Sequence, residues 1–144
     1  MKSSRKAIAV AIASVLLVLG GGTAIANAAT VHTYISDWGS GSVGTYRTST
    51  GADQEINLGT SCTSSTPPPV VNETPSSVQM QLQRYNGLLP DISEGNMTHA
   101  CGTTNNWGVL VSGAQYRYQY NGSTMPGIGY GGWLFSAPSV TITY

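Results

Sequence analysis

Hydrophobic and polar residues alternate at period two along several short stretches of the chain, which is typical of half-buried β-strands. The clearest stretch is 77–85, where apolar side chains at 78, 80 and 82 alternate with three glutamines. Residues 115–120 repeat the pattern, with Tyr116, Tyr118 and Tyr120 on one face and polar side chains on the other. Both stretches predict antiparallel strands with one face on a core and one in water.

The tyrosine-rich stretch predicts a central hairpin. Residues 107–111 lie just upstream, and Ser112-Gly113 between the two runs is typical of a two-residue β-turn. In that register Trp107 opposes Tyr118, and the valines at 109 and 111 share the tyrosine face. We therefore expect the tyrosine stripe to face the core, with Tyr120 beside the next loop and open to a ligand.

Further short strands are expected elsewhere, and no stretch after the first 28 residues has a helical period. The expected strands are 30–36, 43–50, 54–58, 97–101, 133–135 and 139–144. Residues 61–77, which include Pro67 to Pro69, are expected to form a long loop, as are 90–96 and the glycine-rich 121–132. Seven to eight short strands predict an all-β fold, a small antiparallel β-sandwich or barrel.

The first 28 residues have the pattern of a bacterial secretory signal peptide. A basic start is followed by an apolar run over 7–19 and by Ala26-Asn27-Ala28, a small-x-small cleavage site. A retained membrane anchor needs about 20 apolar residues in a row, and the glycines at 20–22 interrupt this run first. We therefore expect a signal peptide at 1–28 and one secreted domain at 29–144, with no membrane span in the mature chain.

Cleavage changes the charge of the protein. The whole chain is formally neutral, but residues 29–144 keep three arginines and no lysine against six acidic residues, a formal charge of −3. A nucleic-acid-binding protein needs a basic patch to neutralise phosphates, and an anionic membrane attracts polybasic segments. Three arginines cannot supply either, so we expect no nucleic-acid partner.

The only two cysteines, Cys62 and Cys101, both lie in the exported part. An even count in an oxidising compartment favours a disulfide. A disulfide that closes a loop of about 40 residues would stabilise the fold by about 4 kcal/mol. No histidine or acidic cluster accompanies them at metal-ligand spacing. Two Gly-x-Gly-x-x-Gly matches, at 39–44 and 127–132, lack the helix that dinucleotide binding requires. We predict no metal and no cofactor.

The inventory for catalysis is poor. His32 and His99 are the only imidazoles, and there is no Gly-x-Ser-x-Gly nucleophile motif. We therefore expect a non-catalytic protein, and the alternative is a small hydrolase, because a Ser-His-Asp triad is defined by geometry and not by sequence order.

Aromatic residues near predicted loops suggest a binding function. A loop Trp or Tyr beside Gly, Asn or Asp offers a ring and hydroxyl-reading partners, which suits a glycan or another cell-surface ligand. The candidate ligand-binding residues are Trp38, Trp107, Tyr120, Tyr130 and Trp133. The competing interpretation is that these rings cap the ends of a small core.

Two other functions are open. No charged residue follows Arg117, so an open edge at the final strand, 139–144, would allow strand addition in a secreted assembly. The competing interpretation is that Val140 and Ile142 close the sandwich between two neighbouring strands. The extended, proline-rich segment 64–74 beside Cys62 could instead occupy a protease cleft, as a protease inhibitor does.

Overall fold

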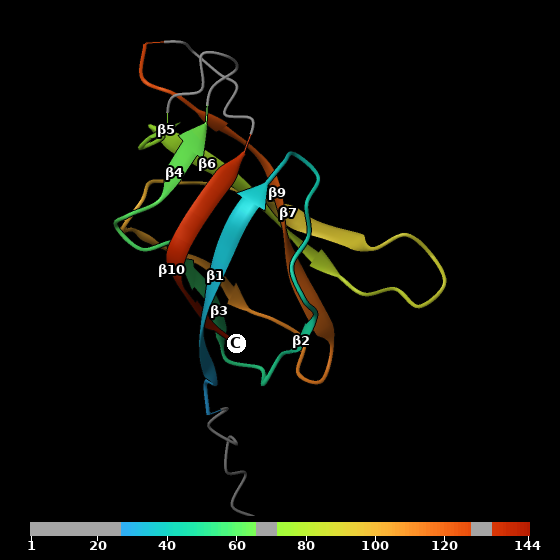
Figure 1. Cartoon of the computed structure of the whole chain (residues 1–144). Helices are drawn as coiled ribbons and strands as arrows, with labels where there is room; N and C mark the ends of the chain where they lie inside the picture. Colours follow the sequence, from blue (N-terminus) through green and yellow to red (C-terminus); the bar gives the residue numbers. More distant parts are fainter. Residues whose placement is uncertain (1–26, 66–71, 128–133) are drawn as a thin grey trace, which may run out of the picture.

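Two antiparallel β-sheets pack face to face around one hydrophobic core in the computed structural model (Figure 1). The structure describes residues 27–65, 72–127 and 134–144. These parts form ten strands and no helix, which confirms the all-β sandwich. The count exceeds the predicted seven to eight because two short strands, at 63–65 and 72–73, flank residues 66–71.

The first sheet is built around the last strand of the chain. Its members are β1 (Thr30–Trp38), β3 (Asp53–Asn57), β4 (Thr63–Ser65), β5 (Asn72–Glu73), β8 (Thr104–Val109) and β10 (Phe135–Thr143). β10 pairs with β1 along one side and with β3 and β4 along the other, while β8 and β5 lie beyond them. The open-edge hypothesis for 139–144 is therefore wrong and the competing interpretation is confirmed, because β10 has a partner on both sides.

The second sheet has the order β2-β9-β6-β7. Its members are β2 (Arg47–Thr48), β6 (Ser77–Arg84), β7 (Ile92–His99) and β9 (Gln115–Thr124). β6 and β7 form a hairpin that extends sideways beyond the sandwich (Figure 1). The expected loop at 90–96 is thus mostly strand, because residues 92–98 pair with the clear alternating strand β6. The second predicted strand, 43–50, shortens to two residues and an isolated bridge at Val43.

The predicted central hairpin does not form. The turn at Ser112-Gly113 is present, since the Ala114 N–H donates to the Val111 carbonyl at 3.2 Å. However, β8 pairs with β3 in the first sheet and β9 pairs with β6 in the second, so the chain crosses between layers here. Pairing β9 with β6 places two strands of alternating apolar and polar residues side by side, with both apolar faces on one core. Local turn chemistry is compatible with either arrangement, and burial decides between them.

The crossover changes which side chains are buried. Val109 and Val111 are 71% and 57% exposed rather than on the tyrosine face. Trp107 does contact Tyr118 edge to face, with ring centroids 5.2 Å apart, but from the opposite sheet. The tyrosine stripe itself is confirmed as core-facing, because Tyr116, Tyr118 and Tyr120 are all buried.

A disulfide joins Cys62 to Cys101, as predicted, with 5.8 Å between the Cα atoms. Cys62 lies between β3 and β4 of the first sheet, and Cys101 lies in the crossover from β7 to β8. The Gly102 N–H also donates to the Gly59 carbonyl at 2.6 Å. The disulfide and this hydrogen bond therefore both fix the β7–β8 crossover to the first sheet.

Candidate functional site

The predicted aromatic platform is not assembled by the described rings. Tyr120 is fully buried, so its expected exposure is wrong. Trp38 and Trp107 are half-buried and pack against the core. Tyr130 and Trp133 lie outside the described residues, so their proposed contacts stay predictions.

Tyr120 instead connects the two layers of the sandwich. Its ring stacks on Phe135 of β10, with centroids 5.3 Å apart. Its hydroxyl donates to Ser123 Oγ at 3.0 Å, and Ser123 Oγ lies 2.6 Å from Ser64 Oγ of the first sheet. Tyr120 was placed near a ligand because a glycine-rich segment follows it, but β9 continues to Thr124 and keeps the ring inside.

A polar surface covers the outer side of the second sheet. Alternation along β6 and β9 turns the tyrosines and aliphatic residues inward and the amides outward. We call this surface the amide face, and its residues are Gln79, Gln81, Gln83, Asn96, Arg117, Gln119 and Asn121. Gln81 is directly opposite both Gln119 and Asn96, and opposed residues share a face at a strand spacing of about 4.8 Å.

Hydrogen bonds hold the amide face in one arrangement. Gln83 Nε2 donates to Gln81 Oε1 at 3.2 Å and also to Gln119 Oε1, while Gln83 Oε1 accepts from Arg117 Nε at 3.1 Å. Gln81 Nε2 donates to Ser93 Oγ at 2.7 Å. A second pair, Asn121 Nδ2 to Asn96 Oδ1, is 2.7 Å long. Gln83 is therefore the centre of the network.

One end of the amide face carries an aromatic corner. Tyr46 and Tyr85 meet edge to face with centroids 5.3 Å apart, and the Arg117 guanidinium lies 4.6 Å from the Tyr46 ring centroid. Tyr46 Oη donates to Asp91 at 2.5 Å, and Asp91 also pairs with Arg117 at 2.7 Å. Desolvation and the bond to Asp91 raise the pKa of Tyr46, so the hydroxyl stays protonated at neutral pH. Tyr85 is 48% exposed and is the accessible ring of the corner.

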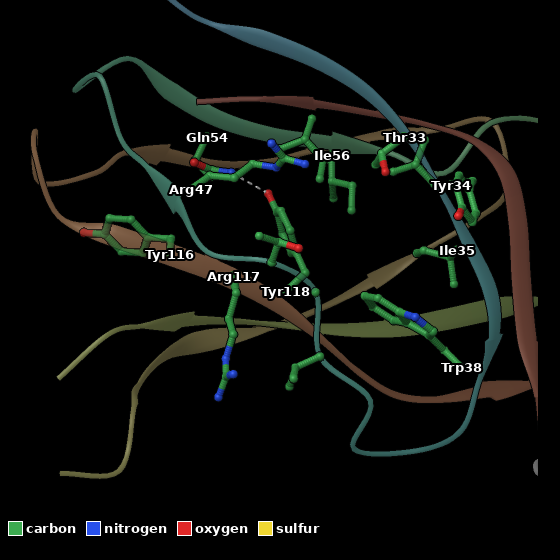
Figure 2. A pocket seen from close by; sticks show the side chains of 15 residues that line it. Thr33, Tyr34, Ile35, Trp38, Arg47, Gln54, Ile56, Tyr116, Arg117 and Tyr118 are labelled. Atoms are coloured by element: carbon green, nitrogen blue, oxygen red, sulfur yellow. Dashed lines mark hydrogen bonds between the residues drawn. The ribbon is translucent and has the colours of Figure 1, made fainter. Parts of the chain in front are cut away.

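A second feature is a pocket between the two sheets, which we call the inter-sheet pocket (Figure 2). It lies where β1, at the edge of the first sheet, approaches the 43–47 segment at the edge of the second. Its volume is about 270 Å³. The apolar wall is formed by Ile35, Trp38, Ile56, Val140 and Ile142.

Gln54, Tyr118 and Arg47 are among the polar side chains that line this pocket. Gln54 is only 3% exposed, and its Nε2 donates to Tyr118 Oη at 2.9 Å, while its Oε1 has no hydrogen-bond partner among the described residues. Burial raises the pKa of Tyr118, so its hydroxyl is neutral and keeps its hydrogen. Figure 2 shows Tyr118 pointing toward Gln54 from the second sheet, with Arg47 beside Gln54 and Arg117 pointing away.

Sequence reasoning missed both features, although each had a signal. Gln54, Ile56 and Leu58 are spaced at period two, so an amide stands on the inward face of a strand. The alternation along 77–85 predicts that its glutamines lie on the solvent-exposed face of a strand. Their meeting with Gln119 and Arg117 depends on the pairing of β6 with β9, which no local pattern reveals.

The two histidines lie in different environments. His32 is on the exposed side of β1, where Nδ1 lies 3.1 Å from Thr141 Oγ1. His99 is 1% exposed, with its ring centroid 5.4 Å from that of Trp107. Within the described part of the chain, neither nitrogen of His99 has a hydrogen-bond partner. Burial lowers the pKa of His99 from 6.5 to about 4.

This pKa predicts a pH-dependent stability. The unfolded chain takes up the proton near pH 6.5, whereas the native protein takes it up only near pH 4. Stability from this group is therefore complete above pH 6.5 and is lost as the pH falls toward 4, by about 3 kcal/mol in full. Urea unfolding at pH 4.5 and 7.5 should show the loss in the wild type and a loss about 2–3 kcal/mol smaller in His99→Leu. Equal losses in the two proteins would contradict a buried neutral imidazole.

Over residues 27–65, 72–127 and 134–144, no three His, Cys, Asp or Glu side chains gather as metal ligands do, and no helix could cross a membrane. No family model, no curated protein and no solved structure matches this chain.

Proposed function

We propose that this chain is an exported, non-catalytic binding module that recognises a glycan through its amide face. The observation that carries the proposal is the hydrogen-bonded network in which Gln83 joins Gln81, Gln119 and Arg117 across β6 and β9, with the separate Asn121–Asn96 pair between β9 and β7. Sugar hydroxyls both donate and accept hydrogen bonds, and so does each amide. A glutamine has two donor hydrogens and two acceptor sites, so amides that already bond one another still have groups to offer a ligand.

The fixed arrangement lowers the cost of binding. Ordering a long side chain costs roughly 0.5–1.5 kcal/mol when a complex forms. Gln81, Gln83 and Gln119 are already held by one another, so less of this cost falls on binding. Tyr85, beside Tyr46, adds a half-exposed ring on which the apolar side of a sugar could stack.

The charges of this surface favour a neutral ligand. Arg117 is paired with Asp91, and Arg84, at the end of β6, is paired with Glu94 at 2.8 Å. Each guanidinium is thus neutralised by a carboxylate close to it. An uncharged polysaccharide suits such a surface better than an acidic one.

The test is a glycan array together with pull-down on insoluble polysaccharides. We expect the double variant Gln83→Ala with Gln119→Ala to weaken binding at least tenfold, because each lost hydrogen bond costs about 1 kcal/mol. Thr141→Ala, on the outer side of the other sheet, is the matched control and should bind normally. Stability should fall by only about 1 kcal/mol per site, since both glutamines face outward and lose network hydrogen bonds but no core packing.

Two different results of the binding test would contradict the amide face as the glycan site. Binding that survives the glutamine variant but is lost in Trp38→Ala with Trp133→Ala would assign the site to the loop aromatics instead. Absence of binding to every glycan would leave a protein partner outside the cell as the ligand. An adaptor subunit would then have to use an edge other than β10, which is paired on both sides. A protease-inhibitor role depends on the segment 64–74, of which residues 66–71 lie outside the described part.

A further inference from the structure

The inter-sheet pocket combines an apolar wall with polar groups that the fold itself does not satisfy. A buried amide oxygen without a partner is costly, at about 1–3 kcal/mol, and each one in a native structure needs a reason. Gln54 Oε1 is such an atom, and Gln54 lines the pocket. A ligand that donates a hydrogen bond to Gln54 Oε1 would explain why this oxygen has no partner in the described part of the protein.

Arg47 supplies the charge. Of the three arginines of residues 29–144, Arg84 and Arg117 are paired with carboxylates, whereas Arg47 forms no ion pair among the described residues. Its guanidinium lies 5.9 Å from the centroid of the Tyr144 ring, an aromatic contact that leaves its N–H donors available in the plane of the group. Arg47 also lines the pocket.

Tyr118 supplies a second donor. Its oxygen accepts from Gln54 Nε2, and that bond does not use the hydroxyl hydrogen. The pocket therefore presents an acceptor at Gln54 and donors at Tyr118 and Arg47. A carboxylate accepts from an arginine fork and a hydroxyl, and a hydroxyl or amino group next to it would donate to Gln54 Oε1.

We infer that the inter-sheet pocket binds a small apolar carboxylic acid that carries a hydroxyl or amino group beside its carboxylate. The carboxylate lies toward Arg47 and Tyr118, the neighbouring O–H or N–H donates to Gln54, and the apolar body packs against Ile35, Trp38 and the other apolar wall residues. The pocket volume of about 270 Å³ equals roughly nine waters at about 30 Å³ each, which limits the ligand to on the order of ten non-hydrogen atoms.

Three related probes separate the contributions of these groups. Phenyllactate has an aromatic body, a carboxylate and an adjacent hydroxyl, whereas phenylacetate lacks the hydroxyl and 2-phenylethanol lacks the carboxylate. We expect phenyllactate to bind with a dissociation constant of about 1 mM or lower, and the other two to bind at least tenfold more weakly. The readout is the movement of the isoleucine and valine methyl signals of the pocket in NMR spectra, checked by calorimetry.

Variants then test the assigned residues. Arg47→Gln should weaken phenyllactate at least tenfold and leave 2-phenylethanol unchanged, while Arg47→Lys should restore part of the affinity because it restores the charge. Arg84→Gln removes an arginine that does not line the pocket and is paired with Glu94, and it is the matched control, with unchanged binding. Gln54→Met keeps the volume of the side chain and should remove the preference for phenyllactate over phenylacetate. If Gln54→Met does not fold, the Arg47 series and the three probes decide by themselves.

The proposal is overturned by any of three results: no methyl shift with phenyllactate at about 10 mM, equal affinity for all three probes, or equal affinity of Arg47→Gln and the wild type. Glycan binding does not enter this test, because no residue of the glutamine double variant lines the pocket. Failure of one proposal therefore leaves the other intact.

Discussion

Replacing Tyr120 by alanine is expected to lower the free energy of unfolding by about 4 kcal/mol. The side chain is fully buried and stacks on Phe135 across the sandwich. Removing a buried aromatic ring loses its transfer free energy and leaves a cavity that a close-packed core fills only in part. Urea denaturation of a protein comprising residues 29–144 measures the change.

The conservative variant Tyr120→Phe keeps the ring and removes only the hydroxyl that donates to Ser123. We expect a loss of about 1 kcal/mol, as for one buried hydrogen bond. A Tyr120→Ala protein of wild-type stability that had lost ligand affinity would contradict the core position and would return this residue to a binding site.

Removing the disulfide is expected to cost a similar amount. Cys62 and Cys101 are 39 residues apart, and closing a loop of that length in the unfolded chain is worth about 4 kcal/mol in the chain-entropy model. The structure adds a native-state reason, since the bond fixes the β7–β8 crossover to the turn after β3. We expect the double variant Cys62→Ala with Cys101→Ala to show this loss in urea denaturation.

Reduction of the wild type provides the control for the cysteine substitutions. A strong thiol reductant should bring the wild type to the stability of the double variant and leave the double variant unchanged. Equal stability of the oxidised wild type and the double variant would show that strand pairing alone holds the crossover.

The sequence by itself determined the fold class, the disulfide and the inward face of the strongest strands. Period-two alternation specifies the strand face because successive side chains point to opposite sides, and this needs no knowledge of the neighbours. Tyr116, Tyr118 and Tyr120, together with the aliphatic residues at 78, 80 and 82, were therefore assigned to the core correctly. Two cysteines leave a single intramolecular pairing.

Only the tertiary structure decided which strands are neighbours, and with them the candidate sites. The turn at 112–113 suits a hairpin, but β8 and β9 separate into different sheets because β9 buries its stripe better beside β6. That pairing brings Gln81, Gln83 and Gln119 together on the amide face. The same packing of two sheets brings Gln54 and Arg47 to one pocket with Tyr118, which is distant from both in the sequence. Contacts between distant residues follow from the sum of burial over the whole core, which no local pattern contains.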